Sequence, residues 1–259
     1  MILSRRAALN GIYLDTLYER IVVTGIDFGA PAETINAVSR MGGAGQRITN
    51  AHYDKLEVTV RFSISASKRD LFARRQIYET ACKWALQGGW LTVNFLPDRR
   101  LWVDKAQIQN PGEMRDWNGE YSILFVAYSV PFWQDVFPVS TTKTSVSSSS
   151  FTLNIPGQYR TVAEVEFTNT SGSSVSTFSI TVGGSTIALT GLSLANNKKL
   201  RIYHTDDGIL KITSDGTSVY SKRSTASADD LYVNPGSASV SMTAGGAGTL
   251  KVSCYGRYA

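Results

Sequence analysis

Few residues in this sequence have types and spacings that suggest catalysis. It contains only two histidines, His52 and His204. No Gly-x-Ser-x-Gly turn, which exposes the nucleophilic serine in many hydrolases, is present. His204 precedes Thr205-Asp206-Asp207, a composition typical of a surface turn. A Ser–His–Asp set or a metal site at His204 remains the alternative, because residues far apart in sequence can meet in space.

Metal-binding and acid–base patterns are also weak. Asp206, Asp207 and Asp215 could share a calcium ion, but they lack the spacing of a calcium-binding loop. Paired carboxylates for sugar hydrolysis cannot be located, since any two acidic residues can meet in the fold. Cys82 and Cys254 have neither a Cys-x-x-Cys nor a Cys/His spacing, which favours two free thiols over a zinc site or a disulfide scaffold. We therefore expect a protein that is not an enzyme and has no cofactor.

A glycine-rich stretch extends from Thr24 to Asn50. Within it, Arg40–Arg47 (RMGGAGQR) is reminiscent of a phosphate-binding loop. It lacks the terminal Gly-Lys-Ser/Thr, and no helix pattern follows it. The periodicity of the whole stretch is too weak to define a helix or strand. We therefore interpret it as a long loop or arm, a type of segment that is usually functional or mobile.

The bulk composition predicts a globular chain of one or two domains. It has 259 residues, of which 42% are hydrophobic and 18% charged. The net charge of +5 is spread along the chain, so a sequence-specific nucleic-acid partner is not expected. Residues 1–17 do not resemble a signal peptide, and no run of ~18 apolar residues predicts a membrane span. These features favour folding in a reducing cytoplasm.

The first part of the chain predicts an antiparallel β domain with one helix. Asn10-Gly11 indicates a tight hairpin, and residues 56–64 alternate between apolar and polar side chains. A capping box at Ser67–Asp70 predicts a helix that ends at Gly88-Gly89. Tyr78 and Trp84 belong to its apolar side. Its opposite, basic side, which includes Arg74, is expected to face solvent or, alternatively, an acidic partner or nucleic acid.

Later strands and a change of composition define the expected domain boundary. Residues 90–96 and 101–108 predict a strand pair joined by a turn at Pro97–Arg100, and Tyr121–Tyr128 predicts the closing strand. Val130-Pro131 then ends the ladder. The candidate domain-junction residues are Pro131, Phe132, Trp133, Phe137 and Pro138.

The remaining residues predict a linker followed by a β-sandwich. Residues 139–150 are rich in Ser and Thr, which is typical of a linker. From residue 151 onward, short apolar segments alternate with turn signals such as Gly183-Gly184 and Gly245-Gly246. The predicted domains are thus residues 1–138, a linker at 139–150, and a sandwich at 151–259.

The order of these features resembles the distal tail protein (Dit) family of long-tailed bacteriophages and prophages. The resemblance covers nearly the whole chain. Its most specific parts are Pro131-Phe132 and the turn formed by Asp229-Asp230-Leu231 with Pro235-Gly236, and Gly208–Gly216 is a further similarity. Family members often have Asn shortly after that Pro-Gly, whereas this chain has Ser237-Ala238.

The resemblance implies a structural protein that forms a homo-hexameric ring at the tip of the virion tail. Its implied partners are the tail tube protein and the tail-tip hub or receptor-binding proteins. The first domain would form the ring, and the galectin-like or carbohydrate-module-like sandwich would face outward. Arginine makes forked bonds to carboxylates across interfaces. The candidate ring-interface residues are Arg40, Met41, Gln46 and Arg47.

A carbohydrate-binding module or adhesin is the alternative function, with a host-surface saccharide as the partner. Sugars commonly stack on Trp or Tyr. All five tryptophans precede Pro138, which counts against a strong lectin in the second domain. The tyrosines that remain as candidates there are Tyr159, Tyr203, Tyr220, Tyr232, Tyr255 and Tyr258. A hydrolase is the third alternative.

Overall fold

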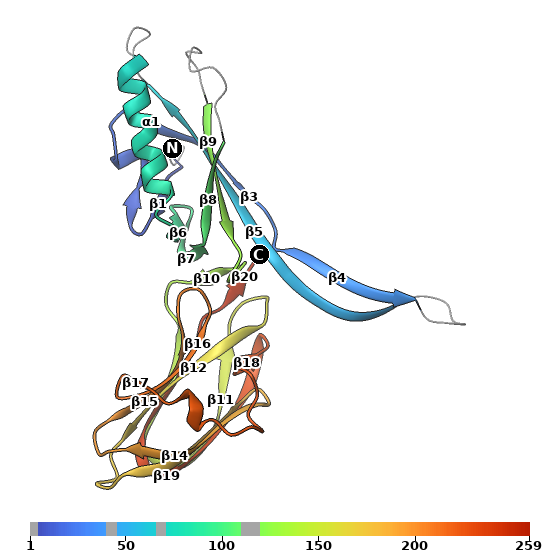
Figure 1. The fold of residues 1–259 in the computed structure, drawn as a ribbon, viewed down its shortest axis with the longest axis vertical. Helices are drawn as coiled ribbons and strands as arrows, with labels where there is room; N and C mark the ends of the chain where they lie inside the picture. The colour runs from blue at the N-terminus through green and yellow to red at the C-terminus, as the bar shows by residue number, and fades with distance from the viewer. Residues whose placement is uncertain (1–4, 40–45, 66–70, 110–119) are drawn as a thin grey trace. The chain divides into compact units, whose positions relative to one another are not determined.

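The chain is mainly β, as expected, and forms two compact units. The computed structural model describes residues 5–39, 46–65, 71–109 and 120–259 (Figure 1). Unit 1 comprises Met1–Trp133 together with Ala259, and unit 2 comprises Gln134–Tyr258. The sequence-based boundary at residue 138 lies a few residues after the boundary between Trp133 and Gln134 in the structure. The antiparallel β domain with one helix and the β-sandwich are both confirmed in the described residues.

Unit 1 contains two antiparallel sheets and helix α1 (Leu71–Ala85). One sheet has the order β3-β5-β9-β8, with β4 paired to β5, and the other contains β2-β1-β6-β7. Asn10 and Gly11 have positive φ angles of 53° and 81°, so the predicted hairpin turn is confirmed. The strands are β1 (Ala7–Leu9), β2 (Ile12–Tyr13), β3 (Ile21–Phe28), β4 (Ala32–Ser39), β5 (Gln46–Ile64), β6 (Gly89–Val93), β7 (Leu96–Val103), β8 (Lys105–Gln109) and β9 (Glu120–Ala127), and β10 (Trp133–Asp135) lies at the unit boundary.

Helix α1 packs on the sheet that contains β5 and β9. The ring of Trp84 meets that of Phe125 edge-on at 5.8 Å, and the ring of Tyr78 lies 5.2 Å from that of Tyr121. The expectation that Arg74 lies on the solvated side is wrong, because only 3% of this residue is exposed. Arg74 precedes the buried Ile77 by three residues, so both lie on the same side of the helix. The predicted capping box lies outside the described residues.

The region between α1 and β9 differs from the prediction. Val93 pairs directly with Leu96, so the turn is at residues 94–95 rather than at Pro97–Arg100. Pro97 lies near the start of β7, where a missing N–H disturbs the ladder least. The expected single strand 101–108 is divided at Asp104, whose carboxylate accepts the N–H groups of Tyr128 and Ser129. The chain therefore moves from one sheet to the other at this residue.

Unit 2 is an antiparallel sandwich in which two long strands belong to both layers. The first part of β19 pairs with β13, and its second part pairs with β12. β11 pairs with β19 along both parts. The strands are β11 (Val139–Ile155), β12 (Thr161–Asn169), β13 (Val175–Val182), β14 (Ser185–Leu194), β15 (Lys199–His204), β16 (Leu210–Ser214), β17 (Thr217–Ser218), β18 (Tyr232–Val233), β19 (Gly236–Cys254) and β20 (Arg257–Tyr258).

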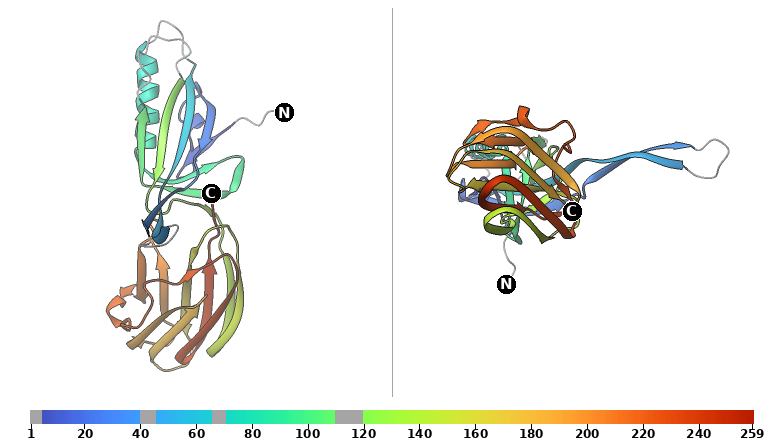
Figure 2. Two further views of the ribbon diagram at one scale, coloured as in Figure 1. Left: turned by 90° about the vertical axis from the view of Figure 1, so that its right-hand side faces the viewer. Right: turned by 90° about the horizontal axis from the view of Figure 1, so that it is seen from below.

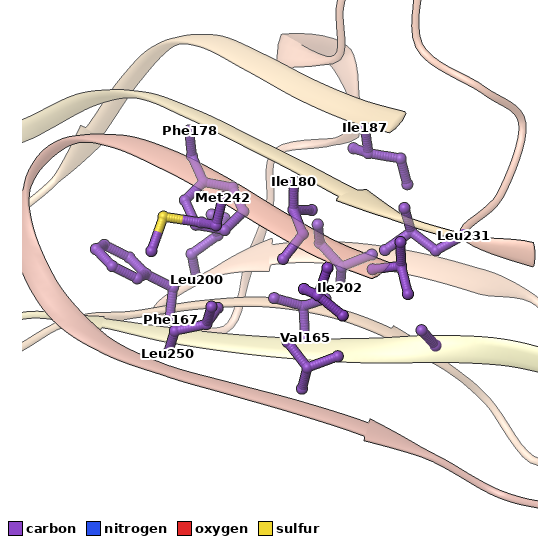
Figure 3. Packing of buried hydrophobic residues seen from close by; sticks show 14 of the residues in the cluster. Val165, Phe167, Phe178, Ile180, Ile187, Leu200, Ile202, Leu231, Met242 and Leu250 are labelled. Carbon is purple, nitrogen blue, oxygen red and sulfur yellow. The ribbon is translucent and has the colours of Figure 1, made fainter. Parts of the chain in front are cut away.

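The core of unit 2 lies between these layers. Apolar side chains from β12, β13, β15 and β19 point into one interior region (Figure 3). Phe167 and Phe178 are almost fully buried, and their rings lie 5.1 Å apart. Leu231 from the predicted Asp-Asp-Leu turn is also buried there, so this turn contributes directly to the core.

Residues 139–150 are not a linker. They form most of β11 and pair with β19 almost residue by residue. Their side chains are largely exposed, so the segment has no alternating apolar pattern by which a strand can be recognised. Gly245-Gly246 is likewise not a turn, because β19 continues through it. At the nearby Gly248, a Cβ atom would lie 2.4 Å from the ring of Phe167, so a glycine is needed for this close approach.

The two ends of unit 2 lie side by side. The Asp135 N–H donates to the Gly256 carbonyl oxygen at 3.2 Å. In return, the Gly256 N–H donates to a carboxylate oxygen of Asp135 at 3.0 Å. The first and last segments of this unit are therefore held together by reciprocal hydrogen bonds.

Candidate functional site

The described residues of the glycine-rich stretch lie largely in strands rather than in an irregular loop: residues 24–28 belong to β3, and residues 32–39 and 46–50 belong to a β-hairpin. β4 pairs with the first half of β5, from Ser39↔Gln46 to Ala32↔Lys55. We call residues 32–55 the arm. It extends away from the rest of unit 1 (Figures 1 and 2). In the described residues, β4 is the only strand that pairs with this half of β5.

The arm has both polar and apolar exposed side chains. The Asp54 carboxylate accepts a hydrogen bond from the Thr34 hydroxyl and lies 2.8 Å from Nε2 of His52. Thr34 is directly opposite His52 in the ladder. On the neighbouring register position, Ile35 is 51% exposed. Because these side chains are exposed, they are available to contact another surface. Such a contact would also stabilise the arm, since an isolated two-stranded hairpin is only marginally stable in water.

Aromatic residues fix the base of the arm. The Tyr53 ring packs edge-on against Phe132 at 5.0 Å, and Phe28 packs against Trp133 at 5.4 Å. Phe132 and Trp133 are both buried. Two of the predicted junction residues, Phe132 and Trp133, thus pack at the base of the arm, where it projects from the rest of unit 1.

The other predicted junction residues have different environments. Pro131 is buried and belongs to unit 1. Pro138 is half-buried in unit 2, whereas Phe137 is 82% exposed. The expected aromatic anchoring of this segment therefore depends on Phe132 and Trp133 and does not include Phe137.

The predicted ring-interface residues lie at the far end of the arm or outside the described residues. Arg40 and Met41 fall outside. The backbones of Gln46 and Arg47 pair with those of Ser39 and Val38 at the distal end of the hairpin. Sequence reasoning did not single out Tyr53 or Phe28, and residues 46–55 lack the apolar–polar alternation of residues 56–64 that would have indicated a strand.

The two histidines each pair with an aspartate. Nε2 of His204 lies 2.8 Å from an Asp230 oxygen, and both side chains are nearly buried. The other oxygen of Asp230 accepts the Leu231 N–H. This pair connects the end of β15 to the Asp-Asp-Leu turn. His204 is thus part of a buried network rather than a surface turn.

The candidate calcium-binding aspartates are not brought together as a metal site. Asp207 accepts a hydrogen bond from Thr205, and Asp215 pairs with Lys198. Among the described residues, no group of three or more His, Cys, Asp or Glu side chains is placed to hold a metal ion. No helix in the described ranges is long and apolar enough to span a membrane.

Unit 2 has a polar groove of about 190 Å³ on its surface. Glu164 and Glu166 of β12 contribute to its lining, together with residues from β15 and β19. A hydrogen bond from Lys199 holds the pKa of the Glu166 carboxyl below its ordinary value. This direction is opposite to the one that a general acid for sugar hydrolysis requires.

The fold closely matches a known phage protein. The SPP1 Dit (gp 19.1) protein, described as a paradigm of the hub adsorption apparatus in phages that infect Gram-positive bacteria, superposes with a TM-score of 0.69. The match covers 97% of this chain and 98% of that one. The chain has the Dit fold. The sequence identity is 12%, so the fold is shared although few residues are identical.

Two further structural comparisons are weaker. Two structures of the phage P2 baseplate in its activated conformation, with Ca and with Sr, superpose with TM-scores of 0.47 at 8% and 7% identity. The alignments cover 98% of both chains in the first case and 97% of both in the second. No protein-family model and no curated protein matches the sequence. The match to the SPP1 Dit protein confirms the resemblance to Dit proteins at the level of the fold.

Proposed function

We propose that this protein is a structural component of a phage tail and forms a hub ring, a hexamer, at the tail tip. The observation that supports this most is the Dit fold over nearly the full length of both chains. The tail tube protein and the tail-tip or receptor-binding proteins are the proposed partners. The proposed role needs no catalytic residue and no cofactor.

We further propose that unit 1 makes the ring contacts through the arm. A closed ring repeats one contact between two different surfaces of identical copies. The arm suits such a contact because it projects from unit 1, exposes Ile35, and has only β4 to support its half of β5. The arm would lie against a neighbouring copy, which would bury side chains that are exposed in a single chain.

The experiment is a shortened arm. Thr34 and His52 are directly opposite, so a two-residue Asn-Gly turn between them replaces residues 35–51 and keeps the anchored base. We expect the parent protein to have the mass of a hexamer by light scattering and the shortened variant to have a lower mass. Tyr220→Ala, an exposed change in unit 2, is the matched control and should retain the parent mass.

Two results would contradict these proposals. A shortened variant that stays hexameric at low micromolar concentration shows that the arm is not a ring contact. A parent protein that stays monomeric alone, and also when mixed with the tail tube protein, contradicts the ring itself. Circular dichroism on each variant shows whether the fold is retained.

A further inference from the structure

The polar groove of unit 2 is built on the outer face of the β19–β12–β15 sheet. Val165 and Ile202 are buried in the core, and side chains alternate along a strand. The residues that directly precede and follow them in sequence therefore face outward. Glu164, Glu166, Arg201, Tyr203, Lys251 and Tyr255 contribute to the lining of the groove.

Two charged groups of this groove, Glu166 and Arg201, are paired with each other. Glu166 is directly opposite both Arg201 and Lys251 in the two ladders. Its carboxylate lies 2.8 Å from Nζ of Lys199 and 3.2 Å from Nε of Arg201. Because these side chains are already paired, a ligand that hydrogen-bonds to them needs to immobilise less side-chain motion on binding.

The second carboxylate is positioned by the end of β15. Glu164 accepts the backbone N–H of His204 at 3.4 Å. His204 in turn is fixed by its buried pair with Asp230. The groove thus contains two carboxylates whose surroundings restrict their positions.

Two tyrosines add aromatic surface to the groove. Of the six tyrosines that the sequence offers as sugar-stacking candidates, the structure places Tyr203 and Tyr255 in this lining. Both are half-buried. The guanidinium of Arg201 lies over the Tyr203 ring, 5.3 Å from its centre. An aromatic surface next to charged hydrogen-bonding groups is suited to a ligand with both C–H and O–H groups.

The charge balance of the groove indicates what kind of ligand it accepts. In the lining, the carboxylates of Glu164 and Glu166 are matched by the cations of Arg201 and Lys251, and Lys199, which lies outside the lining, is paired with Glu166. A phosphate-bearing ligand would compete with Glu166 for its cations. The volume of about 190 Å³ is smaller than the ~300–1,000 Å³ of pockets for drug-sized ligands, which favours a ligand the size of one sugar ring.

We propose that this groove binds one residue of a neutral saccharide, with the carboxylates and Arg201 contacting hydroxyl groups and a tyrosine ring contacting the sugar ring. The sugar could be a free one or the end of a surface polysaccharide, because the chemistry is the same. The site lies within unit 2 and does not depend on the ring proposed above. In a ring, repeated weak sites would reinforce one another.

A second depression on unit 2, of about 290 Å³, provides a contrast. Its lining includes Ser179, Thr181, Ser241 and Thr243. It has neither an aromatic ring nor a charged group in its lining. It therefore lacks an aromatic ring next to charged hydrogen-bonding groups, and it serves as a control surface.

The test is saturation-transfer NMR and titration with the full-length protein. The probes are D-glucose, D-galactose, N-acetyl-D-glucosamine and, as an anionic comparison, sn-glycerol 1-phosphate. We expect at least one neutral sugar to bind, with a dissociation constant on the order of millimolar, as suits a single sugar ring. A polysaccharide with the same terminal sugar then shows whether a chain binds more tightly than the free sugar.

The variants separate the groove from the rest of unit 2. Tyr203→Ala should weaken binding at least about tenfold, whereas Tyr203→Phe, which keeps the ring, should retain it. Glu164→Gln tests the carboxylate. Thr181→Ala on the second depression and Tyr220→Ala outside both surfaces should leave binding unchanged. Thermal unfolding of each variant shows that a loss of binding is not a loss of folding.

Three results would overturn the proposal. The first is that no neutral sugar binds even well above millimolar concentration. The second is that Tyr203→Ala leaves sugar binding unchanged. The third is that glycerol phosphate binds in preference to the neutral sugars and in a salt-sensitive way. Light scattering on the same samples keeps this test separate from that of the ring. A monomer that binds sugar through this groove supports the site independently of the ring, and a ring that binds no sugar supports the ring and overturns the site.

Discussion

Two strands of equal length, β5 in unit 1 and β19 in unit 2, have very different neighbours. Each has 19 residues. β19 has β11 on one side and β13 followed by β12 on the other, along most of its length. Among the described residues, β3 and β9 pair with the second half of β5, and β4 is the one strand that pairs with its first half.

This difference shows what a second neighbour and a buried face contribute. In the second half of β5, alternate residues are completely buried between the sheet and α1. In its first half the same strand pairs with β4 in the part of the chain that the structure describes. The arm keeps the backbone geometry of a strand, but a two-stranded hairpin is only marginally stable in water, and within the chain its base is supported by the contact of Tyr53 with Phe132.

The largest expected effect is at the supported half of β5. Phe62 is fully buried, and its ring stacks with that of Tyr121 at 5.5 Å. We expect Phe62→Ala to lower the free energy of unfolding of unit 1 by about 3–5 kcal/mol, because it leaves a cavity. Urea denaturation followed by tryptophan fluorescence measures this, since all five tryptophans precede residue 138. A loss below about 1 kcal/mol, the size of an ordinary substitution, would contradict the assigned role of this half of β5.

The end of β19 should give a pH-dependent effect. Burial raises the pKa of the Cys254 thiol from 9.0 to about 11. The unfolded chain loses this proton near pH 9 and the folded chain only near pH 11, so stability falls as the pH rises through this window. The loss is at most about 3 kcal/mol for two pKa units. Urea midpoints measured below pH 9 and near pH 11 should show a smaller decrease for Cys254→Ala than for the parent, and equal decreases would refute the assignment.

The buried His–Asp pair of unit 2 should matter less than these core groups. Asp230→Ala removes the acceptor of both His204 and the Leu231 N–H. We expect a loss of about 1.5–3 kcal/mol, typical of hydrogen bonds to a charged group. Chemical denaturation of unit 2, followed by far-ultraviolet circular dichroism, provides the measurement. An unchanged midpoint would mean that this pair does not stabilise the turn.

The equivalent pair on the arm should have the smallest effect. His52 and Asp54 are also 2.8 Å apart, but about half of each side chain is exposed. We expect Asp54→Ala to change the free energy of unfolding by no more than about 0.5 kcal/mol, since exposed ion pairs contribute little. The same denaturation assay as for Phe62→Ala provides the comparison. A loss as large as that of Asp230→Ala would show that the arm is stabilised within a single chain.

The sequence predicts those parts of the fold whose signal is local. The Asn10-Gly11 turn needs positive φ angles that these residues readily adopt, and the alternation at 56–64 reflects burial of one face. Residues 139–150 have no such signal, because their strand identity comes from β19, roughly a hundred residues later in the chain. The arm is similar, since its ladder is defined by pairing rather than by a buried face.

The candidate sites show the same limit. The sequence indicates Tyr203 and Tyr255 as two of six equivalent candidates, and only the pairing of β12 with β15 and β19 places them with Glu164 and Glu166. The anchoring of Tyr53 on Phe132 also joins residues that are far apart in sequence. Sequence patterns give the residue types, whereas the register of distant strands decides which of them meet.

The reciprocal hydrogen bonds between Asp135 and Gly256 have a practical consequence for engineering. A domain whose two ends meet tolerates circular permutation, because a short linker joins the old termini without rebuilding the core. In unit 2 a new break at the exposed Gly183-Gly184 turn would lie between β13 and β14 and would not interrupt either strand. A reporter peptide fused after residue 259 would emerge close to the first residues of unit 2, whereas one placed at the new break would be displayed from the loop between β13 and β14.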